Sequence, residues 1–181
     1  MNVGPRDGLQ NELTVLEPET RAELVNRLAS AGLRRIEVTS FVSAARVPQM
    51  ADAEAVVQGV VPNAAIEYAG LVLNGRGCER LRATGVDRVH FALAVTETFN
   101  RRSAGASVAD SLAAATEILG RARGDGLGST VTLAVAFGCP FEGGSTRAGC
   151  STRTRSRSSA RPVATWNTFG SASTASMATG T

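Results

Sequence analysis

The chain has 181 residues, 43% of them hydrophobic and 19% charged, with 19 arginines, no lysine and 16 acidic residues. This length supports one ordinary domain with a buried core, and no apolar run approaches the roughly 20 residues that a membrane span requires. The start lacks a charged and apolar leader, which favours a cytoplasmic protein. The three cysteines form no Cys-x-x-Cys pair, which argues against a zinc ribbon or a disulfide scaffold.

The charges are divided unequally along the chain. Residues 1–143 carry 14 arginines and all 16 acids, whereas residues 144–181 carry five arginines and no acid. A nucleic-acid-binding face needs clustered cations on the folded part of a protein. We therefore expect no nucleic-acid partner and no membrane partner for this chain.

Helical and strand patterns alternate through residues 1–143. After a short strand at 2–3, the expected helices cover 19–31, 50–58, 75–83 and 108–123, and the expected strands cover 33–38, 65–71, 86–95 and 130–137. Strand–helix–strand units with short connections imply parallel strands and right-handed crossovers. The fold class is α/β, and five strands with four helices amount to a partial (β/α)₈ TIM barrel, which needs about 250 residues when complete.

Residues 144–181 form a second, unlike segment. Serine and threonine occupy 16 of these 38 positions, and leucine, isoleucine and acidic residues are absent. Such a composition cannot bury enough surface to offset chain entropy, so a disordered Ser/Thr/Arg tail is expected. A second interpretation, which we favour, is out-of-frame translation, because GC-rich codons for Ser145 to Thr152, shifted by one base, encode a plausible helix start. An RNA-binding tail is a weaker third interpretation, since Arg-Ser dipeptides occur in tandem only at 155–158 and form no extended repeat.

The first chemical motif, Gly-Pro-Arg-Asp-Gly-Leu-Gln-Asn-Glu, begins at Gly4, directly after the expected first strand. Barrel enzymes place their chemistry at the carboxyl ends of the strands. Asp7 offers a hard oxygen ligand for Mg²⁺ or Mn²⁺, and Arg6 offers a fixed cation for a carbonyl or enolate oxygen. The alternative is an ordinary surface turn.

A second motif places Glu37 inside the strand at 33–38, followed by Thr39 and Ser40. A glutamate among apolar strand residues is costly unless it is paired or functional. If its side chain points into the barrel, it contacts Arg6; the alternative is a glutamate on the wetter strand face. His90, the single histidine, lies in a buried strand and is expected to be a satisfied core or barrel-interior residue.

Together the motifs resemble the hydroxymethylglutaryl-CoA lyase family. The first two are followed by Val-Pro-Gln-Met at Val47 and by Phe-Gly-Cys-Pro-Phe-Glu-Gly at Phe137, in that family's order and spacing over residues 2–143. The resemblance implies metal-dependent cleavage of 3-hydroxy-3-methylglutaryl-CoA to acetyl-CoA and acetoacetate, as in leucine degradation and ketone-body formation. Related aldol-type acyl-CoA lyases and synthases rank second.

The resemblance also assigns roles to single residues. Asp7 matches the metal ligand, Arg6 the group that stabilises the enolate, and Glu37 the acidic residue near the reacting hydroxyl. Substrate-binding positions of the family are matched by Gln10, Ser40 and Ser107. Cys139 is interpreted as structural, and Cys78 is given no role.

The segment 96–107 resembles a family loop near the CoA moiety, where Arg101 and Arg102 either contact CoA phosphates or remain solvated.

Other family features are missing from residues 1–181. The family holds its Mg²⁺ or Mn²⁺ with a later His-x-His pair and an asparagine, and it uses a cysteine on a glycine-rich loop. None of these is present in residues 1–181, so we expect neither firm metal binding nor turnover by this chain. The alternative is a non-catalytic remnant or interaction fragment; the intact form is expected to bind acyl-CoA and to be a homodimer.

Overall fold

The computed structural model describes residues 1–143; the segment 144–181, where the tail was expected, lies outside the described residues. Four parallel strands alternate with five α-helices, and two short helical turns flank the first strand. The strands are β1 (Arg35–Ser40), β2 (Glu67–Val72), β3 (Arg88–Ala94) and β4 (Gly128–Ala134). The helices are α1 (Pro18–Ser30), α2 (Ala53–Gln58), α3 (Gly75–Arg82), α4 (Glu97–Ala104) and α5 (Val108–Gly124), with a π-turn η1 (Gly4–Gly8) and a 3₁₀ turn η2 (Pro48–Met50).

The sheet has the strand order β1-β2-β3-β4, so each strand pairs in parallel with its neighbour in sequence. Parallel strands in sequential order, connected by helices, are the arrangement found in a segment of a (β/α)₈ barrel. The expected first strand is reduced to one parallel bridge between Asn2 and Ile36, which nonetheless places η1 beside β1. The expected four main helices are confirmed as α1, α2, α3 and α5, with shifts of a few residues at their ends.

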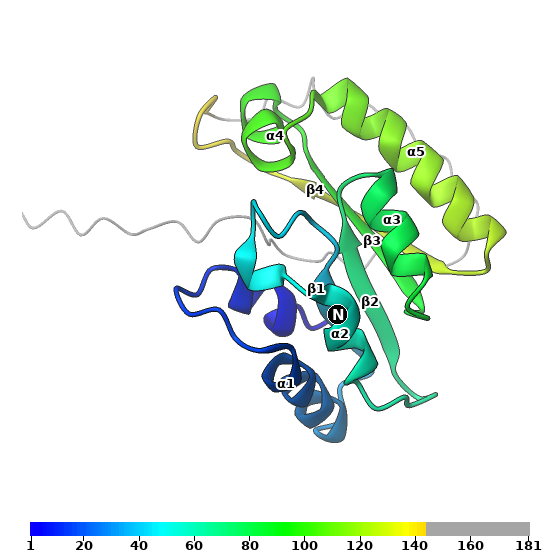
Figure 1. The fold of residues 1–181 in the computed structure, drawn as a ribbon. Coiled ribbons are helices and arrows are strands. Elements are labelled where there is room, and N and C mark those ends of the chain that lie inside the picture. Colours follow the sequence, from blue (N-terminus) through cyan, green and yellow to red (C-terminus); the bar gives the residue numbers. More distant parts are fainter. Residues whose placement is uncertain (144–181) are drawn as a thin grey trace, which may run out of the picture.

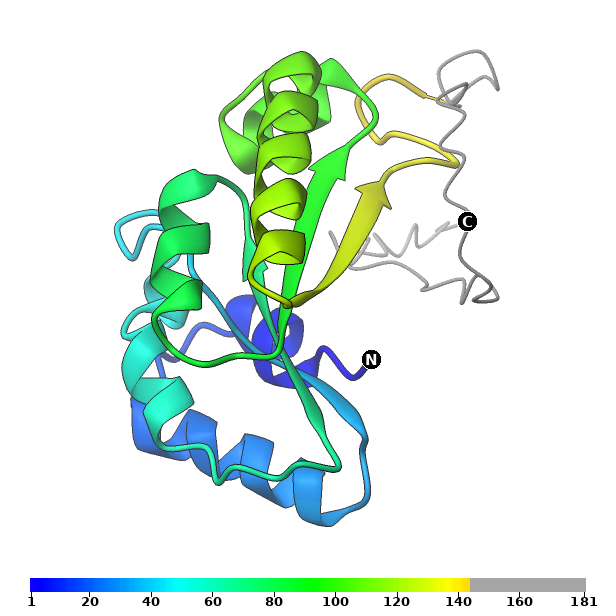
Figure 2. The same cartoon turned by 90° about the vertical axis from the view of Figure 1, so that its right-hand side faces the viewer.

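The core lies between the sheet and its covering helices (Figure 1). Figure 2 shows α1, α2, α3 and α5 gathered along the same side of the curved sheet. Their apolar faces meet Ile36, Phe91 and other strand residues that are essentially inaccessible to water. On β4, by contrast, Val131 and Leu133 remain 39% and 47% exposed. No helix within residues 1–143 is long and apolar enough to span a bilayer.

Two features differ from the sequence expectation. Helix α4 forms where a loop was expected, and buried Asn100 anchors it by accepting a hydrogen bond from the Ala94 backbone (2.9 Å) and donating to the carbonyls of Ala106 and Ser107 (both 3.0 Å). Strand β4 ends at Ala134 instead of 137, because Val135 adopts a left-handed backbone with φ of 53°.

A close approach of backbones fixes α3 against the segment after β1, and it yields a stability prediction. A Cβ added to Gly77 would lie 2.6 Å from the Phe41 carbonyl oxygen, whereas one added to Gly75, two residues earlier, meets nothing within 4 Å. We expect Gly77→Ala to lower the free energy of unfolding by about 1–3 kcal/mol through overpacking. Gly75→Ala should be neutral or stabilising by up to about 1 kcal/mol. Urea denaturation of both variants checks this, and equal effects would contradict the packing argument.

Candidate active site

A buried ion pair lies at the centre of the site. Arg6, in η1, donates from Nε to Oε1 of Glu37 in β1, and both side chains are fully inaccessible to water. The bridge at Asn2 brings the two together, because it places the start of the chain beside the first residues of β1. The contact expected from the sequence is therefore present, and Glu37 is on the inner side of the sheet.

The second oxygen of Glu37 is held by a histidine from another strand. His90, in β3, contacts Oε2 of Glu37 through Nδ1 and lies 2.8 Å from Oγ1 of Thr132, in β4, through Nε2. His90 is only 2% exposed. It is thus a satisfied interior residue, as expected, but it contacts the candidate catalytic carboxylate directly. Thr132 was not identified from the sequence. The alternation of Thr130, Thr132 and Ala134 with apolar residues along β4 would have placed it on the inner face of the sheet.

A β-bulge brings Ser40 to the same side of the sheet as Glu37. The register with β2 shifts between Glu37 and Thr39, so that Ser40 pairs with Leu71, which in turn pairs with His90. In a regular strand, residues three apart face opposite sides, and bulges commonly re-aim side chains in this way. The buried Ser40 hydroxyl has no hydrogen-bond partner among the described residues, which leaves it available to a bound molecule.

Asp7 and Gln10 are less buried than the Arg6–Glu37 pair. Asp7 accepts a hydrogen bond from Nη1 of Arg6 at 2.8 Å, and its side chain is 23% exposed. Burial raises the pKa of the Asp7 carboxyl, with repulsion from Glu37 in the same direction and the charge of Arg6 opposing it. Gln10, directly after η1, is half-buried.

Glu37 is ionised despite its burial. Burial alone would raise its pKa, but the hydrogen bond from His90 and the charge and hydrogen bond of Arg6 outweigh it and hold the pKa below the ordinary value. A carboxylate accepts hydrogen bonds at both oxygens, and here Arg6 serves one oxygen and His90 the other.

Ser107 is not part of this cluster. Its hydroxyl caps α5 by accepting from the Asp110 backbone at 3.0 Å and by donating to the Asp110 carboxylate. Its local contacts are those of a helix N-cap. The substrate role expected for Ser107 is therefore not supported by any contact with the Arg6–Glu37 pair.

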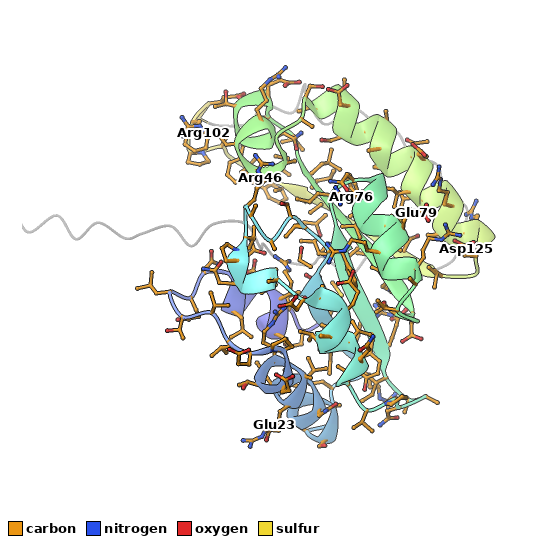
Figure 3. The ribbon with its side chains drawn as sticks, in the orientation of Figure 1. Glu23, Arg46, Arg76, Glu79, Arg102 and Asp125 are labelled. Carbon is orange, nitrogen blue, oxygen red and sulfur yellow. The ribbon has the colours of Figure 1, made fainter. Side chains whose placement is uncertain are left out.

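The arginines of the 96–107 segment lie on α4, at the carboxyl end of β3. Arg101 pairs with Glu97, and the Arg102 guanidinium stacks 4.2 Å from the centre of the Phe141 ring. Figure 3 shows Arg46 and Arg102 beside α4, away from Glu79 and Asp125, which belong to a surface ion-pair network between α3 and α5. Arg101 and Arg102 remain exposed, so a phosphate can reach them.

The described residues do not form a metal site on their own. Within residues 1–143, no group of three or more His, Cys, Asp and Glu side chains is arranged to hold a metal ion. Asp7 offers one carboxylate, already paired with Arg6, and the sequence from 144 onward contains no His, Asp or Glu. Firm binding of Mg²⁺ or Mn²⁺ requires several oxygen ligands, so these residues supply at most one part of such a site.

Comparisons with known proteins agree with the arrangement. A family model described as HMGL-like matches residues 1–157. The (R)-citramalyl-CoA lyase of Chloroflexus aurantiacus is 40% identical over 153 residues, which cover 79% of this chain and 48% of that protein. The cytoplasmic 3-hydroxy-3-methylglutaryl-CoA lyase of Mus musculus is 36% identical over 143 residues, 79% of this chain and 42% of that protein.

A solved structure gives the same result for the fold. The HMG-CoA lyase from Acinetobacter baumannii in complex with coenzyme A and 3-methylmalate superposes with a TM-score of 0.78 at 34% identity, over 82% of this chain and 48% of that one. The described sheet is therefore part of a lyase-type TIM barrel, and the chain spans about half the length of the relatives it matches.

Proposed function

The chain belongs to the HMGL-like family, whose members are carbon–carbon lyases, and from this membership we propose that the whole protein cleaves 3-hydroxy-3-methylglutaryl-CoA to acetyl-CoA and acetoacetate. The observation that carries the proposal is the buried Arg6–Glu37 pair beside the partly exposed Asp7. These residues come from the two motifs that carry the family resemblance, and the fold brings them into contact.

The chemistry of the cleavage matches these charges. Removal of the hydroxyl proton and cleavage of the carbon–carbon bond convert the substrate hydroxyl to the carbonyl of acetoacetate and leave an enolate on the other fragment. This enolate then takes up a proton to become acetyl-CoA. Negative charge that develops on the enolate oxygen is stabilised by a fixed cation in a water-poor site, which we assign to Arg6. Glu37, ionised at neutral pH, is assigned to the side of the reacting hydroxyl.

Substrate contacts are assigned to the polar groups around this pair. The unpartnered Ser40 hydroxyl and the half-buried Gln10 amide are available to the acyl group. The exposed Arg101 and Arg102 are placed to meet CoA phosphates, which arginine binds well. We assign Asp7 as one ligand of a divalent metal in the whole protein, but no step of the reaction is derived through that ion.

A second substrate is favoured by one comparison. The citramalyl-CoA lyase matches this chain at higher identity than the 3-hydroxy-3-methylglutaryl-CoA lyase, 40% against 36%. Both names denote lyases that act on a hydroxyacyl-CoA. Citramalyl-CoA is therefore the alternative substrate of the same proposed reaction type.

For the intact form, we further propose that the protein is a homodimer and that it is located in the cytoplasm.

The test uses the purified chain with each acyl-CoA, with and without Mn²⁺. We expect acyl-CoA binding by calorimetry, weakened at least tenfold in Arg6→Gln, and no metal-dependent release of acetoacetate, because the chain offers only one candidate metal ligand. Arg27→Gln, on the exposed face of α1, is the matched control and should bind normally. Metal-dependent turnover would overturn the expectation of an inactive chain, and absence of any acyl-CoA binding would contradict the proposed site and favour a non-catalytic fragment.

A further inference from the structure

His90 and Thr132 form a buried unit behind the candidate catalytic carboxylate. His90 comes from β3 and Thr132 from β4, so these two side chains connect Glu37, in β1, to the opposite edge strand of the described sheet. Neither residue belongs to the motifs that carry the family resemblance. The groups that face Glu37 among the described residues are Arg6 and His90 by hydrogen bond and Asp7 by charge.

The donors and acceptors define the state of the imidazole ring. A carboxylate oxygen only accepts hydrogen bonds, so Nδ1 of His90 carries the hydrogen that Oε2 of Glu37 receives. In the neutral ring Nε2 then holds a lone pair, which accepts the hydroxyl hydrogen of Thr132 across 2.8 Å. One hydrogen-bond direction is thus consistent along the whole row from Thr132 through His90 to Glu37.

We propose that His90 is a positioning residue for Glu37, and that Thr132 locks the His90 ring in the tautomer this task requires. Arg6 holds one carboxylate oxygen and His90 the other, so the carboxylate cannot rotate about its terminal bond without losing a charge-assisted hydrogen bond. The proposal rests on the proposed function, in which Glu37 must present a fixed, ionised carboxylate to the substrate hydroxyl. Second partners of this kind commonly set the orientation of the groups that do chemistry.

The chain has one histidine, so nitrogen NMR of the ¹⁵N-labelled protein reads this ring without assignment ambiguity. At neutral pH we expect Nδ1 to be protonated and Nε2 to be unprotonated. Thr132→Val should shift the Nε2 resonance. Thr130→Val is the matched control, because Thr130 lies on the same face of β4 but contacts Arg88 at 3.1 Å, and it should leave the ring unchanged.

Two outcomes of this measurement would overturn the proposal. A ring protonated at Nε2, alone or together with Nδ1, removes the role assigned to Thr132. Equal spectra of Thr132→Val and Thr130→Val would do the same. The readout needs neither substrate nor turnover, so absence of acyl-CoA binding would count against the proposed function and leave this result intact.

A second pair of variants tests the effect on Glu37 itself. His90→Asn keeps a short amide donor, whereas His90→Leu removes it. In ¹³C spectra we expect the Glu37 carboxyl resonance to stay near the wild-type position in His90→Asn and to move in His90→Leu. A resonance unchanged in a folded His90→Leu protein would show that His90 only fills space; should that variant fail to fold, the threonine variants decide.

Discussion

Replacing Arg6 with methionine is expected to lower the free energy of unfolding by about 3–5 kcal/mol. The substitution keeps most of the side-chain volume but leaves the fully buried Glu37 carboxylate without the cation that faces Oε1. An uncompensated buried charge is costly because water no longer solvates it. Urea denaturation at pH 7, followed by circular dichroism, measures the loss.

Two controls separate the buried charge from a general loss of arginine. Arg27, in an exposed pair with Glu23 on α1, should cost less than about 0.5 kcal/mol when changed to methionine. The double variant Arg6→Met with Glu37→Met removes both charges, so it should cost clearly less than the two single changes together. Simple additivity would mean that Arg6 and Glu37 do not stabilise each other.

The contact between Arg6 and Glu37 was predictable, because two polar groups near the carboxyl ends of neighbouring strands share one edge of a parallel sheet. The position of Ser40 relative to Glu37 was not. It depends on the bulge between Glu37 and Thr39, and a bulge has no strong sequence signature at this site. The roles assigned to these residues stay predictions.

Helix α4 shows a different limit of pattern reasoning. Its sequence, ETFNRRSA, has no apolar stripe, and local periodicity therefore favours a loop. The helix is fixed by tertiary contacts instead, through Asn100 and through the Phe99 ring against Phe141, 5.9 Å between centroids. Likewise, Val131 and Leu133 were expected in a strand, and only the structure reveals that they remain 39% and 47% exposed on β4.

Acidification is expected to separate the contributions of the two carboxyls of the site. The pKa of Glu37 is lowered below its ordinary value of 4.5, so its contribution to stability is complete above pH 4.5 and is lost as the pH falls through the folded-state pKa. The pKa of Asp7 is raised above 3.8, so its ionisation costs stability as the pH rises through the raised value. Acid therefore strengthens the fold through Asp7 before it weakens the fold through Glu37.

Single amide variants distinguish these opposite effects. We expect Glu37→Gln to be less stable than wild type at pH 7 and to lose less stability between pH 4.5 and pH 3. In the wild type, each unit by which the pKa of Glu37 is lowered contributes about 1.4 kcal/mol of stability at neutral pH, and acid removes this contribution. Asp7→Asn should instead lose the gain on mild acidification. Glu54 and Glu67, whose pKa values are also lowered by arginine partners, contribute equally to all three proteins, so the differences isolate the site. If Glu37→Gln had the wild-type acid slope, Glu37 would not be held ionised by Arg6 and His90.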